Sequence, residues 1–572
     1  MGKKQSKNYG KEAISMAIKI NAPADIFRSL RENGAYYIDK TMILKEYLEE
    51  RFEEAVLFTR PRRFGKTMLM TMIRDFLDIR RDSRDVFEGL EIMKCEDIVA
   101  NYMNQYPVIF ISLKETHSID YKKVYEYLQV VVANLCASYG ELLHSDKIMD
   151  ADKDRFRELS SQSANEANTI VFLDTLSRML HAHFGKQVFI IIDEYDVPMA
   201  RTYGTPAYDQ TRVMIERMLS CVCKSNEHVK AVLLTGCLYT VKNSTYTGVN
   251  NIKAYTVLSP RYATYFGFTD GEVRKLLEDA ELTDHYDTVK EWYDGYLFGN
   301  DKMYCPWDVL SYVDSVQWGE YDEDQGPDTY WVNTSETSLD LIHGFFGKTA
   351  EANESFEKLL AGDTIDCIVD DAIPYHRIHE NGDNLWSTLV ETGYLTKAVK
   401  GRPALMPLRI PNKGIHKVFL REVWSYFRDR VDNVFVRDLT AALWAGESRR
   451  AEEALNQILE ATLSFYHEYH EYSYHLILDG FFTGLGYRVI SEQETGYGRS
   501  DLVIMDPARN RCLLLELKHV KKQDDMEAAL KEAGSQIIEK KYQSRLVYQG
   551  YHERKQYAMA FCGKNCRIGE IC

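Results

Sequence analysis

The sequence has no long hydrophobic run, since no apolar stretch approaches the roughly 18 residues that a membrane-spanning helix needs. The segment from Met1 to Lys11 is polar and basic, unlike a secretory signal peptide. Cysteine is scarce, and its 11 residues are scattered over the chain, which argues against a disulfide framework and is typical of reduced thiols. We therefore expect a cytoplasmic protein with no membrane partner.

Positive charge is also in deficit. Lys and Arg total 70 against 86 Asp and Glu, so the net charge is -16. This balance excludes a protein whose whole surface attracts nucleic acid, but it leaves room for a local basic groove. A cluster near the C-terminal end has that local basic character, as a groove for a phosphate backbone requires: Lys518, Lys521, Lys522, Lys540 and Lys541.

A chain of 572 residues exceeds a single core, and its patterning changes along its length. Apolar strands predicted at 55–59, 108–112, 188–192 and 231–235 alternate with helices, including one over 167–184, which predicts a mostly parallel sheet covered on both faces. From about Phe266 helices dominate, and a helix followed by two short strands between 385 and 419 suggests a winged-helix module. The last stretch has the pattern of a small α/β unit that closes with a strand over 555–562. We predict three domains, over 20–265, 266–464 and 465–572.

A phosphate-binding loop follows the first predicted strand: Arg60-Pro61-Arg62-Arg63-Phe64-Gly65-Lys66-Thr67. Strand, loop and helix is the order that a P-loop requires, because loop N–H groups and the helix start surround an anion. Lys66 would reach the β- and γ-phosphates, and the Thr67 hydroxyl would ligate Mg²⁺. The usual pattern opens with glycine, where this chain has Arg60. The motif predicts that Arg63, Gly65, Lys66 and Thr67 bind ATP and Mg²⁺.

The second half of this predicted site lies about 130 residues further on. An apolar strand ends in Asp193, which would hold Mg²⁺, and Glu194, which would orient the attacking water. Thr235 ends the next strand, where a γ-phosphate sensor would lie. A buried strand followed by an acidic helix cap is the structural alternative, and the preceding P-loop favours the nucleotide site. No arginine finger is recognisable, so a homo-oligomer that supplies one stays open.

These motifs resemble a known family. The stretches 36–40, 60–67 and 193–198, the last reading Asp-Glu-Tyr-Asp-Val-Pro, are similar to the family called AAA-ATPase-like. The resemblance covers about residues 20 to 330, and it is closer to archaeal-type and STAND ATPases than to ring-forming unfoldases. Arg60 is itself part of that family's pattern. The resemblance implies a P-loop NTPase fold, so that the fold class is α/β.

Four charged residues near the C-terminal end predict a second site: Glu471, Asp501, Glu516 and Lys518. Glu516 and Lys518 are two apart on one predicted strand and therefore share a face. A charged pair within such an apolar strand is costly unless it has partners. Asp501 and Glu516 would hold one or two Mg²⁺ ions, with Mn²⁺ as an alternative, and Glu471 could add a ligand. Lys518 would orient the water, although a plain hairpin with a cross-strand Glu–Lys pair would show the same spacing.

Residues 465–572 resemble the PD-(D/E)xK nuclease domain that commonly follows this ATPase. The stretches that carry the resemblance are 471–475, 496–501, 516–518 and 536–542. It implies a restriction-endonuclease-like fold and metal-dependent cleavage of nucleic acid.

Three functional hypotheses follow. The first is an ATP-regulated nuclease acting on nucleic acid, with DNA favoured over RNA, in defence or DNA processing. The second is a non-cleaving, nucleotide-dependent switch or scaffold that binds nucleic acid or a protein. The third, a chaperone-like motor, lacks a recognisable pore loop. A regulatory protein or other trigger is an expected partner in the first two.

Overall fold

The computed structural model describes residues 18–50, 52–116, 118–240, 249–322, 326–330, 350–378, 380–428, 433–462, 471–491, 501–539 and 551–571. The chain divides into two compact units, and each contains two separate stretches. One unit comprises Met1–Tyr321 with Ile368–Ala404, and the other comprises Asp322–Cys367 with Leu405–Cys572. The predicted helical middle region thus contributes to both units, and the three predicted domain boundaries stay a prediction.

The first unit is built on a five-stranded parallel sheet, which confirms the predicted mostly parallel sheet and its four strands and adds a short fifth strand that was not predicted. The strand order is β2-β3-β4-β1-β5. This order puts β4 between the strand that precedes the phosphate loop and the strand that ends in Asp193. The carboxyl ends of these three strands are therefore neighbours. The strands are β1 (Ala55–Thr59), β2 (Val108–Ser112), β3 (Val188–Asp193), β4 (Val229–Gly236) and β5 (Lys253–Tyr255).

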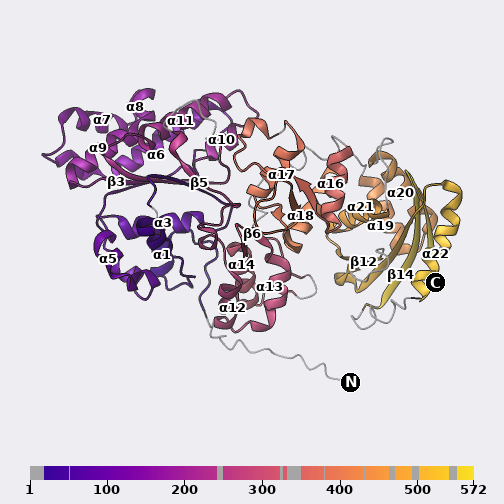
Figure 1. Cartoon of the computed structure of the whole chain (residues 1–572). Helices are drawn as coiled ribbons and strands as arrows, with labels where there is room; N and C mark the ends of the chain where they lie inside the picture. Colours follow the sequence, from indigo (N-terminus) through magenta and orange to yellow (C-terminus); the bar gives the residue numbers. More distant parts are fainter. Residues whose placement is uncertain are drawn as a thin grey trace, which may run out of the picture. The chain divides into compact units, whose positions relative to one another are not determined.

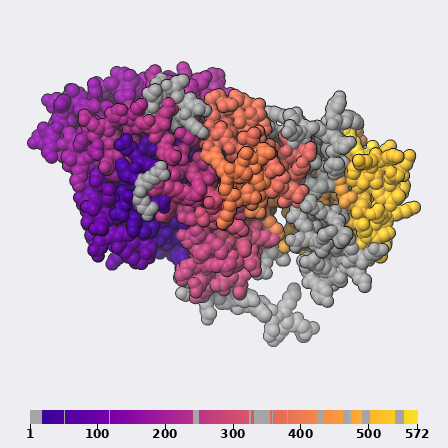
Figure 2. All heavy atoms as spheres, viewed as in Figure 1, coloured from indigo at the N-terminus to yellow at the C-terminus, as the bar shows by residue number. Residues whose placement is uncertain are grey.

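Helices cover both faces of this sheet (Figure 1). Alternate residues of β1 point to opposite sides, so Leu57 packs into one core while Val56 and Phe58 pack into the other. In the space-filling view the indigo atoms of one layer lie below the purple atoms of the other (Figure 2). One layer contains α1 (Phe27–Glu32), α3 (Lys66–Leu77) and α5 (Glu96–Tyr102); the other contains α6 (Tyr121–Ala137), α7 (Asp150–Ser160), α9 (Phe172–Phe184) and α11 (Tyr208–Cys223).

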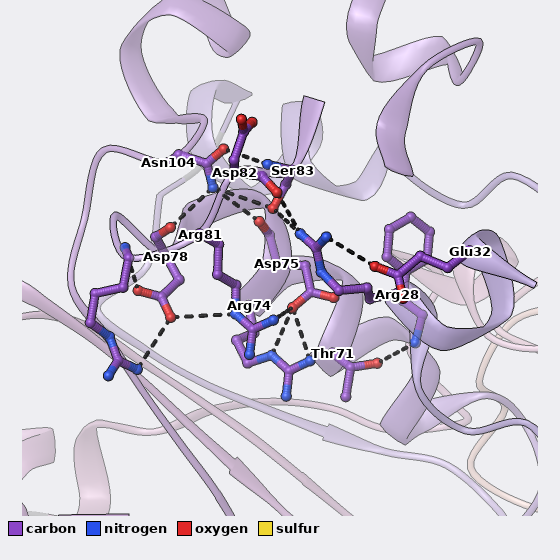
Figure 3. A network of polar contacts seen from close by, with 12 residues as sticks. Arg28, Glu32, Thr71, Arg74, Asp75, Asp78, Arg81, Asp82, Ser83 and Asn104 are labelled. Atoms are coloured by element: carbon purple, nitrogen blue, oxygen red, sulfur yellow. Dashed lines mark hydrogen bonds and ion pairs between the residues drawn. The ribbon is translucent and has the colours of Figure 1, made fainter. Parts of the chain in front are cut away.

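A polar network fixes the carboxyl end of α3, the helix that begins in the phosphate loop (Figure 3). Asp75 is fully buried, and it pairs with Arg74 at 2.9 Å and with Arg81 at 3.2 Å. The Asn104 side chain donates to the carbonyl oxygen of Asp78 at 3.0 Å, just after the helix ends. A buried carboxylate is tolerated only when it is paired in this way. The network therefore holds the far end of α3 in place.

The rest of the first unit consists of helices and one hairpin. Most predicted helices are present. The prediction of one continuous helix over 167–184 is wrong, because the helix is interrupted at Val171, between α8 (Glu166–Ile170) and α9. Val171 has φ -96° and ψ 19°, outside the helical range. The other elements are α12 (Asp270–Asp279), α13 (Tyr286–Tyr293), β6 (Tyr296–Phe298), β7 (Asp301–Met303), α14 (Pro306–Gln317), α10 (Val197–Thr202), α17 (Gly382–Glu391) and β9 (Thr396–Lys397).

The second unit begins with helices and a small antiparallel strand pair. Strands β8 (Ile365–Cys367) and β10 (Met406–Arg409) pair with each other. The helix and two strands that suggested a winged helix are present as α17, β9 and β10, while the winged-helix module itself stays a prediction. The helices of this unit are α16 (Ala350–Leu360), α18 (Lys413–Arg428), α19 (Asn433–Ala445) and α20 (Ser448–Thr462).

A five-stranded mixed sheet ends the chain, in the order β11-β12-β13-β14-β15. Only β13 and β14 run parallel, and every other neighbouring pair is antiparallel. The prediction that a strand near 555–562 closes the fold is wrong, because a further strand follows a tight turn in which Gly563 has φ 57°. The elements are α21 (Glu471–Gly484), β11 (Arg488–Ser491), β12 (Asp501–Asp506), β13 (Arg511–His519), α22 (Met526–Glu539), β14 (Glu553–Cys562) and β15 (Asn565–Ile571).

Candidate nucleotide and nuclease sites

The phosphate loop joins β1 directly to α3. Two of its residues adopt left-handed backbone conformations, Arg63 with φ 67° and Gly65 with φ 80°. No atom would touch a Cβ added at Gly65, so the conformation and not a lack of space calls for glycine there. The loop ends at the N-terminus of a 12-residue helix, where the helix dipole and N–H groups favour an anion. The side chain of Arg63 is exposed, and its guanidinium lies 3.8 Å from the ring centre of Trp307.

Lys66 is held against the loop that precedes it. Its ammonium group donates to the carbonyl oxygens of Arg60 and Pro61, both at 3.2 Å, and lies 3.6 Å from a Glu194 carboxylate oxygen. Burial opposes the positive charge, but Cys237 and nearby carboxylates, Glu194 first among them, raise the pKa of Lys66 above its ordinary value. Lys66 is therefore a buried cation at the place where a triphosphate would need one.

Two threonine hydroxyls converge on Asp193. The Thr67 hydroxyl donates to one carboxylate oxygen at 2.8 Å, and the Thr235 hydroxyl donates to the other at 2.5 Å. Burial, reinforced by the charge of Glu194, raises the pKa of Asp193. The structure thus brings together three predicted residues that come from α3, β3 and β4. Hydroxyl and carboxylate oxygens are the hard donors that Mg²⁺ prefers, so this set fits the predicted ion.

Glu194 follows β3 in a left-handed conformation, with φ 54°. Its N–H donates to the Thr235 hydroxyl at 3.4 Å, while its carboxylate approaches Lys66. This backbone turn directs the Glu194 carboxylate toward the phosphate loop instead of along the strand. This conformation is unusual for glutamate, and residues held in it are typical of functional sites.

Asp196 is a further residue of this site, and its role was not predicted from the sequence. It is 2% exposed, and one carboxylate oxygen accepts from the N–H groups of Cys237 and Leu238 at 2.9 and 3.0 Å. The same oxygen accepts from the Tyr375 hydroxyl at 3.4 Å. Burial, followed by the charge of Glu194, raises the pKa of Asp196 to about 6. Asp196 therefore fixes the chain just beyond Thr235, and its place in the Asp-Glu-Tyr-Asp stretch was the available signal.

The predicted nuclease residues lie in and beside β13. The strand register sets Asp501 of β12 directly opposite Glu516, and the side chain of Asp501 lies outside the described residues. Cys512 and Leu514 lie on the same face of β13 as Glu516 and Lys518, two positions apart from one to the next, and pack against α22. Glu516 and Lys518 therefore share the α22 face of the sheet.

Lys518 and Glu471 each have one further contact that the sequence did not reveal. The Lys518 ammonium lies 4.0 Å from a Glu532 oxygen on α22. Glu471, at the start of α21, accepts from the N–H of His519 at 3.2 Å, which places it at the end of the strand that carries Lys518. Glu516 and Lys518 thus share one face of β13, and Glu471 lies beside the end of that strand, while their joint role as a site stays a prediction. Lys540 and Lys541 lie outside the described residues.

Within the described parts of the chain, no three His, Cys, Asp or Glu side chains are grouped to hold a metal ion. The C-terminal candidates still offer the right chemistry, because Glu516 and Glu471 supply carboxylates and the register adds position 501.

Among the helices of the described residues, none combines the length and hydropathy that crossing a membrane requires.

Comparison with known proteins finds matches in two separate regions of the chain. A curated protein of Azotobacter chroococcum mcd 1, named "Uncharacterized protein in vnfD 5'region", is 24% identical over 314 residues, which cover 54% of each chain. The chain thus spans about half the length of that relative. Family models match residues 23–246, as Predicted AAA-ATPase, and residues 469–571, as the PD-(D/E)XK nuclease superfamily. The protein therefore joins an AAA-ATPase-like region to a PD-(D/E)XK nuclease superfamily region in one chain.

Proposed function

We propose that this protein binds and hydrolyses ATP in its first unit and cleaves nucleic-acid phosphodiester bonds in its second. The observation that carries the proposal is the convergence of Thr67 and Thr235 on Asp193, beside a buried Lys66. These side chains come from three separate elements, and a buried strand end has no structural need for all of them.

In the first unit each side chain has a distinct role. Lys66 binds the β- and γ-phosphates, for which its ammonium exchanges the carbonyl oxygens that it contacts now. Glu194 orients the attacking water, since its carboxylate lies on the same side of the loop as Lys66. Thr235 senses the γ-phosphate through Asp193, and Thr67 and Asp193 would hold Mg²⁺.

In the second unit Asp501, Glu516 and Glu471 would hold Mg²⁺ or Mn²⁺. A bound ion lowers the pKa of its water and stabilises the charge of the phosphate in the transition state. Lys518 orients the water and offsets negative charge, from the face of β13 that it shares with Glu516. DNA is the favoured substrate, and we expect the nucleotide state of the first unit to govern cleavage, in defence or DNA processing.

A metal-dependent cleavage assay tests this proposal. Single- and double-stranded DNA and RNA are incubated with the protein and Mg²⁺ or Mn²⁺, with and without ATP. We expect cleavage to be lost in Asp501→Ala and altered in Lys66→Ala, while Glu553→Ala, an exposed change at the start of β14, leaves it intact. Nucleotide binding without cleavage of any substrate would instead support a non-cleaving switch.

A further inference from the structure

One segment of the first unit has an unusual place in the chain. Ile368–Ala404 belongs to the unit that contains the phosphate loop, yet the residues before and after it, up to Cys367 and from Leu405, belong to the other unit. The segment contains α17. Because its neighbours in sequence belong to the other unit, it is covalently linked at both ends to the unit that contains the nuclease-like sheet.

This segment contacts the phosphate loop and the chain that follows β3. The Thr59 hydroxyl, at the end of β1, donates to Glu391 at the carboxyl end of α17, at 3.2 Å. A Cβ added at Gly393 would lie 2.9 Å from the Pro61 side chain, so the turn after α17 packs tightly on the loop. The Tyr375 hydroxyl, from the same segment, donates to Asp196 at 3.4 Å.

Arg60 gives this contact its electrostatic character. Its guanidinium is fully buried, lies 4.8 Å from the ring centre of Phe266, and donates to the carbonyl oxygens of Thr59 and Tyr255 at 2.7 and 2.8 Å. Its Nε and Nη2 atoms are buried and make no hydrogen bond, and neither does Oε1 of Glu391. Burial lowers the pKa of Arg60 to about 10, and the charge of Glu391 opposes that change.

Each of these two groups makes burial of the other tolerable. An isolated charge inside a protein is strongly disfavoured, and an opposite charge nearby offsets part of that cost. Burial and then Asp371 raise the pKa of Glu391 well above its ordinary value, whereas Arg60 opposes this. The arginine at the start of the loop therefore depends on an acid that α17 supplies. A glycine, the usual residue at that position, would need no such partner.

We propose that Glu391 is a positioning residue for the phosphate loop, so that docking of the segment Ile368–Ala404 and binding of nucleotide are energetically coupled. The inference rests on the proposed nucleotide binding and adds how that site is regulated. If docking strengthens nucleotide binding, nucleotide must strengthen docking by the same factor. Since both ends of the segment continue into the other unit, nucleotide state then changes the restraint on the chain that leads there.

Affinity for a nonhydrolysable ATP analogue with Mg²⁺ tests the coupling in the full chain. Glu391→Gln replaces the acid that acts on Arg60 with a neutral amide of the same shape, and Thr59→Val removes the hydroxyl donor but keeps a branched residue in β1. We expect each to weaken binding about tenfold, a typical size for such coupling. Ser387→Ala is the control. The buried Ser387 hydroxyl of α17 donates to the carbonyl oxygen of Asp383 and accepts from the N–H of Asp370, and both groups lie inside the segment.

Hydrogen exchange of the α17 amides gives a second readout that a purely structural role would not change. The analogue should slow exchange in residues 382–391 of the wild-type protein, and the slowing should shrink in Thr59→Val. Unchanged affinity in Thr59→Val and Glu391→Gln, or an equal loss in Ser387→Ala, would overturn the inference. If Glu391→Gln does not fold, Thr59→Val and the wild-type exchange decide the matter. Failure of the wild-type protein to bind the analogue would refute the proposed function itself.

Discussion

Replacing Asp196 with asparagine should remove a pH dependence from the stability of the first unit. The carboxylate is almost completely buried, and it accepts two backbone N–H groups and the Tyr375 hydroxyl through one oxygen. The other oxygen is buried without a hydrogen bond. An asparagine can keep the three accepted bonds with its carbonyl oxygen, so the substitution mainly removes the charge.

The magnitude follows from the pKa of Asp196, which burial and then Glu194 raise to about 6. An aspartate in an unfolded chain has a pKa of about 3.9, so the difference of about 2 units corresponds to ~3 kcal/mol. Between pH 4 and pH 6, roughly, the folded protein holds more protons than the unfolded chain. Stability therefore falls as pH rises through this window, and the full cost of the buried charge is present above it.

Hydrogen exchange of the β3 and β4 amides measures this local stability at a series of pH values. The wild-type protein should lose about 2 kcal/mol more than Asp196→Asn between pH 4 and pH 7, because part of the ~3 kcal/mol falls below pH 4. Taking the difference between the two proteins removes the contributions of Asp193 and Glu391, whose pKa values are also raised. Asp209→Asn, at an exposed position of α11, is the control. Parallel pH profiles for the wild type and Asp196→Asn would refute the reasoning.

Three further substitutions test the two sites and the network behind the first. Thr235→Val removes a hydrogen bond to a buried carboxylate, so we expect the free energy of unfolding in urea to fall by about 2 kcal/mol. Phosphate release from ATP should also slow, and an unchanged rate of release would exclude the hydroxyl from the reaction. Asp75→Ala removes the buried counter-charge of Arg74 and one of the two that Arg81 has, because Arg81 also pairs with Asp78, and it should cost about 3 kcal/mol. An unchanged denaturation midpoint would show that water replaces the pairing. Lys518→Met should abolish cleavage while nucleic-acid binding, measured by fluorescence anisotropy, persists; retained cleavage would exclude the proposed role.

The parts of the fold that the sequence predicts are those with local causes. The strands β1 to β4 consist mainly of branched and aromatic apolar residues and are almost entirely buried, so each was recognisable alone. The convergence of Lys66 and Asp193 was also predictable, because a P-loop and an acidic strand end imply a known neighbourhood in a parallel sheet. The break at Val171 was not, since helical spacing continues across it and no proline or glycine marks the point where the helix ends.

Contacts between remote segments have no comparable local signal. Glu532 became a neighbour of Lys518 only through the packing of α22 on β13, and Asp196 acquired its bonds from the chain beyond β4. Neither contact follows from periodicity, because periodicity specifies a face but not the residue that will cover it. The register between β12 and β13, in contrast, follows from a short hairpin and put Asp501 opposite Glu516 as expected.

Arg60 shows how such a remote partner can still leave a trace in the sequence. An arginine at the start of a phosphate loop, directly after a buried strand, must either reach solvent or find an acid inside the protein. The chain contains an acid of the matching kind, since Glu391 is the buried last residue of α17, but it lies 332 positions along the chain from Thr59. Two unfavourable local choices, each costly alone, thus offset part of each other's cost through their opposite charges. This compensation links α17 to the start of the phosphate loop, which is the physical reason to expect that α17 and the nucleotide act on each other.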